Sequence, residues 1–167
     1  AGNFVTAREV LDEVGKDAFR FFMLMYDPAT HMDFDLELAK KKSADNPVYY
    51  VQYAHARICS IFRKAKAESG TRSPDYSRLI HPAEIALIKQ LIRLPEIIYD
   101  ISQNFAVHRL ANFSVETANV FHKFYEQCKV ISKDYDLSKA RLSLVFATKI
   151  IIAATLKLMG ISAPERM

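Results

Sequence analysis

The chain has 167 residues and a formal net charge of +4, and half of its residues are hydrophobic. A chain of this length fits one domain and can bury about 70% of its unfolded surface, so it needs no covalent staple to fold. Its two cysteines, Cys59 and Cys128, match no C-x-x-C spacing, which predicts free thiols in the reducing cytoplasm. The longest apolar run is interrupted by Lys149 and Lys157, so we expect neither a membrane span nor a membrane partner.

Residues 1–35 are predicted to form two short helices and an extended piece. Thr6, with Glu9 three residues later, is typical of a capping box at the start of a helix that Gly15 ends. Asp17 is expected to cap the second helix, and the Asp27–Pro28 step should break it.

A short helix is predicted from Leu36, with Asp35 as its cap. The neighbouring carboxylates Asp33, Asp35 and Glu37 raise the alternative of a divalent metal site. No glycine turn and no bidentate glutamate complete a calcium loop here, so capping and solvation are the preferred roles. We therefore expect no metal in this chain.

The stretch 46–57, NPVYYVQYAHAR, predicts the start of a long helix, because Asn46 can cap it and Pro47 suits its first turn. We expect this helix to continue to Ser69, before Gly70. One stripe is apolar and should face the core: Val51, Ala54, Ile58, Ile61, Phe62 and Ala65. An adjoining strip at the rim of that core face carries aromatic and cationic side chains: Tyr50, Tyr53, Arg57 and Lys64.

After an exposed connection at 70–80, the patterns predict further helices. Proline starts two of them, at 82–93 and 96–105, and an amphipathic helix follows at 108–127 with Tyr125 on its inner side. The last helix, ended by Gly160, is apolar over most of its circumference and is expected to run through the middle of the bundle. The fold class is therefore all-α, a helical bundle of about six to eight helices.

The distribution of charge permits a polyanionic partner on and just after the central helix. Residues 46–93 contain 8 Lys and Arg against 3 Asp and Glu, whereas residues 1–45 contain 6 against 9. Aromatic rings beside cations suit unstacked nucleotides, because a ring stacks on a base while Arg and Lys attract phosphate. The alternative is a helical protein-interaction module in which the Tyr and Arg side chains form a hot-spot patch.

No catalytic residue is expected. No two of the five histidines lie three or four residues apart on one helix, and the chain has only 4 glycines, too few to suggest a phosphate loop. His55 is interpreted as a hydrogen-bonded structural residue near the core.

Three separated phrases of the sequence, AGNFVT, NPVYYVQYAHAR and GISAPERM, resemble arginyl-tRNA synthetases along the whole chain. The resemblance implies a helical bundle of the class I synthetase anticodon-binding type at 36–167. It also implies that residues 1–35 form a connecting segment after a catalytic domain that this chain lacks. Because AGNFVT follows the ATP-binding signature loop in that family, the chain is expected to be a C-terminal fragment.

The function implied by this resemblance is recognition of the anticodon loop of arginine tRNA in the cytoplasm. The fragment itself should need no cofactor, whereas the full-length ligase uses ATP and Mg²⁺. Its expected partners are arginine tRNA and its own upstream catalytic domain, and we expect a monomer. The anticodon-binding residues implied are Tyr53, Tyr50, Arg57, Lys42, Asn46, Arg166 and Met167.

Overall fold

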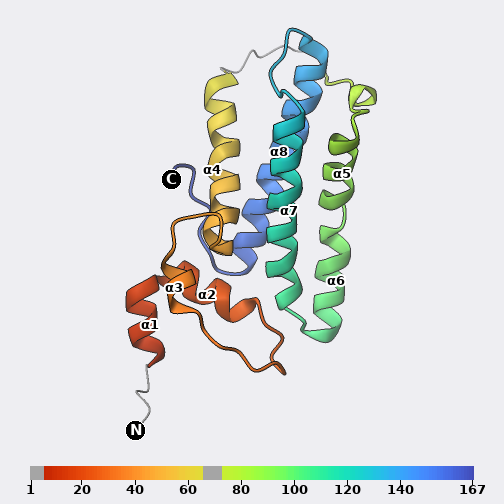
Figure 1. Cartoon of the computed structure of the whole chain (residues 1–167). Coiled ribbons are helices and arrows are strands. Elements are labelled where there is room, and N and C mark those ends of the chain that lie inside the picture. The colour runs from red at the N-terminus through yellow and green to blue at the C-terminus, as the bar shows by residue number, and fades with distance from the viewer. Residues whose placement is uncertain (1–5, 66–72) are drawn as a thin grey trace.

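The computed structural model describes residues 6–65 and 73–167, and within these ranges it contains helices and no strand. This confirms the all-α expectation (Figure 1). In chain order the elements are α1 (Ala7–Val14), α2 (Lys16–Leu24), α3 (Leu36–Lys40), α4 (Pro47–Ala65), the short 3-10 helix η1 (Tyr76–Arg78), α5 (Pro82–Leu91), α6 (Leu94–Asn104), α7 (His108–Gln127) and α8 (Tyr135–Leu158).

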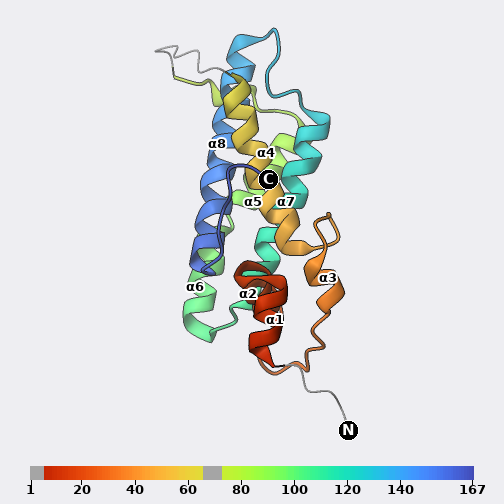
Figure 2. The ribbon, with the colours of Figure 1, turned by 90° about the vertical axis from the view of Figure 1, so that its left-hand side faces the viewer.

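The long helices α4, α7 and α8 lie side by side with the α5–α6 pair, and α1–α3 form a small group near the start of α4 (Figures 1 and 2). The most central helix is α7, which packs against α2, α4, α5, α6 and α8. The expectation that the last helix runs through the middle is wrong, because α8 leaves Phe146, Ile150 and Leu158 at least half exposed. A helix that is apolar on every side can still be buried on one side only.

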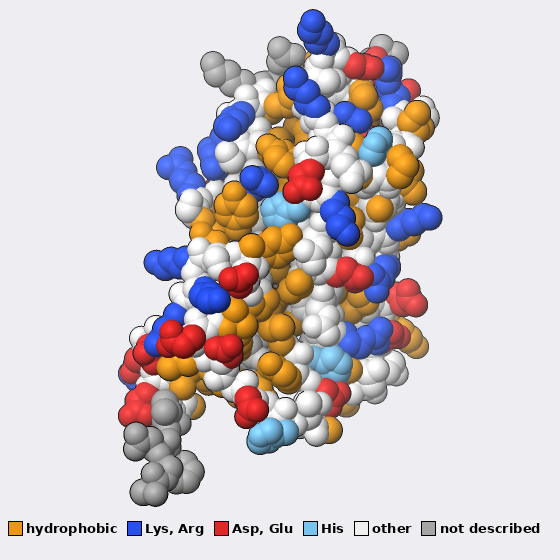
Figure 3. All heavy atoms as spheres, viewed as in Figure 1, with side chains coloured by type: hydrophobic (Ala, Val, Ile, Leu, Met, Phe, Trp, Pro, Cys, Tyr) orange, Lys and Arg blue, Asp and Glu red, His pale blue; other side chains and the backbone are white. Residues whose placement is uncertain are grey.

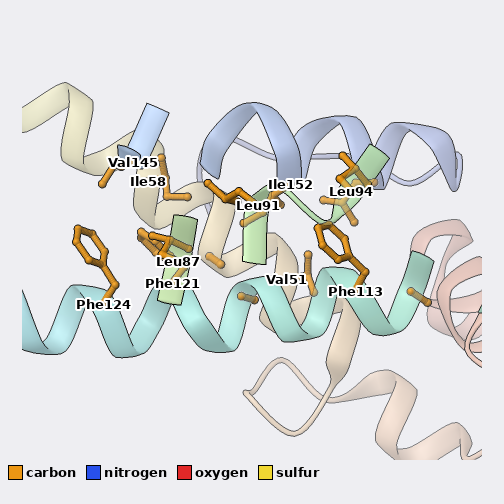
Figure 4. Close-up of a cluster of buried hydrophobic side chains, with 14 of the residues drawn as sticks. Val51, Ile58, Leu87, Leu91, Leu94, Phe113, Phe121, Phe124, Val145 and Ile152 are labelled. Atoms are coloured by element: carbon orange, nitrogen blue, oxygen red, sulfur yellow. The ribbon is translucent and has the colours of Figure 1, made fainter. Parts of the chain in front are cut away.

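One hydrophobic core joins the helices, and its centre is filled by side chains from five of them (Figure 4). Phe121 and Phe124 of α7 are fully buried in it, as are Ile58 of α4 and Leu87 of α5. Burying an aliphatic or aromatic side chain of this size contributes about 1.5–3 kcal/mol. The five helices therefore share a core that fixes where α4 and α7 lie relative to one another.

Local capping chemistry starts most of these helices where the sequence predicts. The Thr6–Glu9 capping box is present, and the Asp35 carboxylate accepts a hydrogen bond from the backbone N–H of Leu38 at 2.8 Å. The prediction that Asp17 caps the second helix is wrong, because α2 begins at Lys16 with Gly15 as its cap, and no side chain caps it. The Asp17 carboxylate is instead turned toward Gln52 and the C-terminal residues.

The end of α8 turns sharply and sends the last residues back along α4 (Figure 2). Gly160 has a φ of 70°, which only glycine adopts without strain. The N–H of Ile161 donates to the carbonyl of Leu156 at 2.9 Å and that of Gly160 to the carbonyl of Lys157 at 2.9 Å. These two bonds form a Schellman motif, which satisfies carbonyls that the helix end leaves open.

Parts of the sequence predictions fall outside the described residues. These are Ala1–Val5, with most of the AGNFVT phrase, and the expected end of the central helix at residues 66–70. The described part of that helix, α4, begins at Pro47 as predicted.

Candidate nucleic-acid interface

The exposed strip of α4 carries the aromatic residues that the sequence singles out. Tyr53 is 38% exposed, and its ring lies parallel to that of Tyr49, with centroids 6.5 Å apart and an interplanar angle of 7°. The two residues are one helical turn apart, which brings their rings onto one face. A flat aromatic surface is therefore held at the rim of α4.

The guanidinium of Arg57 lies between two rings from different helices. Its central carbon is 5.1 Å from the ring centroid of Tyr53 on α4 and 5.0 Å from that of Tyr125 on α7. Cation–π contacts of this kind contribute about 0.5–1 kcal/mol each at exposed sites. Arg57 thus links α4 to α7 and is held in place while it carries its charge at the surface.

Tyr50 lies deeper than Tyr53 and packs against His122 of α7, with ring centroids 5.0 Å apart. Burial raises the pKa of the Tyr50 hydroxyl; Glu126 adds to the rise and Arg57 opposes it. Burial lowers the pKa of His122, and the charge of Arg57 lowers it further against the opposing effect of Glu126. Both effects favour the neutral imidazole, and its buried Nε2 has no hydrogen-bond partner within residues 6–65 and 73–167.

A groove of about 470 Å³ lies beside this aromatic strip, between the second half of α4, the end of α7 and the last two residues of the chain. In Figure 3, Lys and Arg side chains gather over the upper part of α4 and α7, with hydrophobic side chains between them. The groove is lined by Tyr53, Ala56, Arg57, Ser60, Ile61, Arg63, Lys64, Tyr125, Arg166 and Met167.

The last residues reach this groove because α4 holds their backbone. The Nδ1 atom of His55 is 2.9 Å from the carbonyl oxygen of Pro164, and Arg63 donates to the carbonyl of Glu165 at 3.1 Å. Lys149 of α8 adds an ion pair with the Glu165 carboxylate at 3.3 Å. The prediction that His55 is a hydrogen-bonded structural residue is confirmed, and its partner is this tail.

Asn46 and Lys42 lie in the loop before α4, and neither lines the groove. Asn46 is only 3% exposed, and its Nδ2 donates to the carbonyls of Ala39 and Lys41 at 3.0 and 2.8 Å. It therefore holds the loop against the helix start. Lys42 is exposed on the same loop.

Of the seven residues that the resemblance implied, the groove brings together Tyr53, Arg57, Arg166 and Met167. Three groove or floor residues were not singled out as binding candidates: Arg63, Tyr125 and His122. Tyr125 was expected on the inner side of its helix, but it is 37% exposed and its ring lies against the guanidinium of Arg57. The sequence signal that could have indicated them is the spacing of His122 and Tyr125, which are three residues apart and therefore on one helix face.

The acidic stretch before α3 serves capping and surface ion pairs. Besides the Asp35 cap, Lys40 pairs with Glu13 at 2.7 Å and with Glu37 at 3.1 Å. Nowhere in residues 6–65 and 73–167 do three or more His, Cys, Asp and Glu side chains gather as metal ligands would. None of the helices in these ranges is long and apolar enough to cross a membrane.

The fold and the groove together define an all-α domain that presents stacked aromatic rings and fixed cations, a surface suited to unpaired nucleotides. Residues 51–167 match the model of the DALR anticodon binding domain, and the chain belongs to this family.

Relatives of the chain are arginine–tRNA ligases. That of Dehalococcoides mccartyi is 50% identical over 167 residues, and that of Geotalea daltonii is 49% identical over 172 residues. The matches cover 99% and 100% of this chain but 30% of each relative, so the chain spans about a third of the length of the proteins it matches.

Solved structures agree with this family. The arginyl-tRNA synthetase of Thermus thermophilus superposes with a TM-score of 0.82 at 32% identity, covering 99% of this chain and 28% of that one. The arginyl-tRNA synthetase of Plasmodium falciparum gives a TM-score of 0.78 at 28% identity over 90% of this chain and 26% of that one.

Proposed function

We propose that this chain recognises the anticodon loop of arginine tRNA, as the C-terminal part of an arginine–tRNA ligase. The observation that carries the proposal is the groove in which Tyr53, Arg57 and Tyr125 stand beside Arg63 and Lys64, within a domain of the anticodon-binding family. The identity of the tRNA is proposed from the relatives, which are arginine–tRNA ligases.

Each residue around the groove has a distinct part in this proposal. The exposed face of Tyr53 stacks on an unpaired base, and Arg57 neutralises a neighbouring phosphate. Tyr50 forms the floor beneath this site with His122. The tail residues Arg166 and Met167 form the opposite wall.

The loop before α4 is proposed to contact the RNA outside the groove, since neither of its candidate residues lines the groove. Lys42 offers its charge to the RNA backbone from an exposed position. Asn46 acts indirectly, because both hydrogen atoms of its amide nitrogen are used to hold the loop.

The whole protein is proposed to join arginine to its tRNA with ATP and Mg²⁺ in the cytoplasm, and to act as a monomer. Residues 1–35 then connect a catalytic domain to the bundle at 36–167. The residues present here do not fit ATP or Mg²⁺, since the chain has 4 glycines and its described residues hold no metal-ligand cluster. Mixed with ATP, arginine and tRNA, this chain alone should therefore give no aminoacylation.

Salt dependence separates this function from a protein-interaction patch. Each phosphate contact to single-stranded RNA contributes about −0.7 to the slope of log K against log salt concentration. With three or four of the groove cations engaged, the slope should lie at about −2 to −3. An apolar protein interface would show almost no slope.

The test is a titration of the chain with arginine tRNA and with the same tRNA carrying an altered anticodon, at about 50, 100 and 200 mM salt. Tighter binding to the native anticodon with the expected slope supports the proposal. Equal binding to both RNAs, or no binding at all, would rule out anticodon recognition by this chain.

A further inference from the structure

Asp17, in the first turn of α2, contacts two segments that are distant in sequence. Its Oδ2 accepts a hydrogen bond from Nε2 of Gln52 on α4 at 2.9 Å, and its Oδ1 accepts one from the backbone N–H of Ser162 at 3.3 Å. The Ser162 hydroxyl donates to the same carboxylate. One carboxylate therefore joins α2, α4 and the C-terminal tail.

The other two members of this cluster contact each other as well. Nε2 of Gln52 also donates to the backbone carbonyl of Ser162 at 3.0 Å, and the Gln52 side chain is 9% exposed. One turn after Asp17, the Arg20 side chain donates to the carbonyl of Met159 at 3.0 Å. Two side chains of α2 thus hold the tail at its beginning.

The tail carries groove residues at its other end. Only three residues separate Ser162 from Arg166, and the backbone between them is held against α4 by His55 and Arg63. A tail released at Ser162 loses the anchor that sets its direction on leaving α8. Asp17, which is absent from the groove lining, thus holds the segment that leads to Arg166 and Met167.

We propose that Asp17 is a positioning residue for RNA binding, which acts by fixing the C-terminal tail so that Arg166 and Met167 complete the groove. The inference rests on the proposed function of the groove. The inference also assigns a role to α2, because the position of this helix then determines where the C-terminal tail enters the groove.

For the substitution Asp17→Asn, the inference predicts a change in RNA affinity opposite to the one expected from net charge alone. Asparagine offers one acceptor oxygen where three donors now converge, so at least one donor is left facing an amide nitrogen. Removing a negative charge makes the chain more basic, and general electrostatics then predicts tighter RNA binding. The tail mechanism predicts weaker binding, by about tenfold, or about 1.4 kcal/mol.

The experiment compares Asp17→Asn with Asp12→Asn, a matched control. Asp12 is exposed on α1 and pairs with Arg8 of the same helix, and its substitution changes the net charge equally. Each substitution is made in the 167-residue chain and in a chain that stops after Glu165. Affinity for arginine tRNA and amide exchange at residues 161–163 and 165 are measured for all of them, with Ser162→Ala as a milder second variant.

The expected result is a loss of affinity in the full chain that disappears in the shortened chain, together with faster tail exchange. A loss of the same size in the shortened chain would overturn the inference, because Asp17 would then act through the fold. Unchanged affinity or unchanged tail exchange in Asp17→Asn would also overturn it. If the parent chain fails to bind the tRNA, the proposed function fails, and tail exchange alone then decides whether Asp17 anchors the tail.

Discussion

Replacing Tyr53 with alanine should weaken RNA binding while leaving the chain folded. The ring is 38% exposed on an open groove wall, so its loss creates no closed cavity. A fully buried aromatic residue costs about 3–5 kcal/mol on truncation to alanine, and a rim residue should cost about 1–2 kcal/mol. That estimate includes the lost contacts with Tyr49 and Arg57.

The loss of one base stack should cost about 1–3 kcal/mol of binding free energy, which is roughly a 5- to 150-fold decrease in affinity. The assay is a titration with arginine tRNA and with an anticodon variant of it, while circular dichroism reports helical content. Tyr53→Phe keeps the ring and should bind within about threefold of the parent if stacking is the cause.

Tyr99→Ala is the matched control, because Tyr99 is 66% exposed on α6, outside the groove lining. It should leave binding unchanged. If Tyr53→Ala binds both RNAs as the parent does, α4 is only a scaffold and the base is stacked elsewhere.

Four further outcomes are expected. Arg57→Ala should make the salt slope of RNA binding shallower by about 0.7, as the loss of one phosphate contact does, and an unchanged slope would show that this charge does not meet the RNA. Gly160→Ala should lower the free energy of unfolding by about 1–2 kcal/mol in urea titration, because its φ of 70° is strained for alanine and the new Cβ would lie 2.8 Å from Arg20. The free energy of unfolding of the parent should fall as pH falls below about 6.5, because folded His122, with its lowered pKa, resists a proton that the unfolded state binds. His122→Phe should make this dependence of stability on pH weaker. An identical pH profile for the two proteins would contradict the explanation. Amide exchange should be faster in α1, which has no buried residue, than in α2, where Phe21 is fully buried; equal protection would contradict this.

Local chemistry made much of the fold predictable. The Asn46–Pro47 pair marked the start of α4, and the helix predicted at 108–127 has the bounds of α7. The two proline-led helices were placed within two residues of α5 and α6. These signals act over a few residues, which is why sequence alone reveals them.

Long-range partners explain what the sequence could not reveal. Asp17 matched a helix cap by type and position, but its partners lie 35 and 145 residues away. Tyr125 is on a helix whose apolar face is broad, so periodicity could not separate the inner side from the rim. The deep location of His122 likewise depends on packing between α4 and α7.

The aromatic cluster also provides an optical signal. The chain has 8 tyrosines and no tryptophan, so its intrinsic fluorescence comes from tyrosine alone. Tyr49, Tyr50, Tyr53 and Tyr125 all lie at or beside the groove, so half of the emitters are where a ligand would stack. A nucleobase placed on these rings should quench their emission, which would let occupancy be followed without any attached dye.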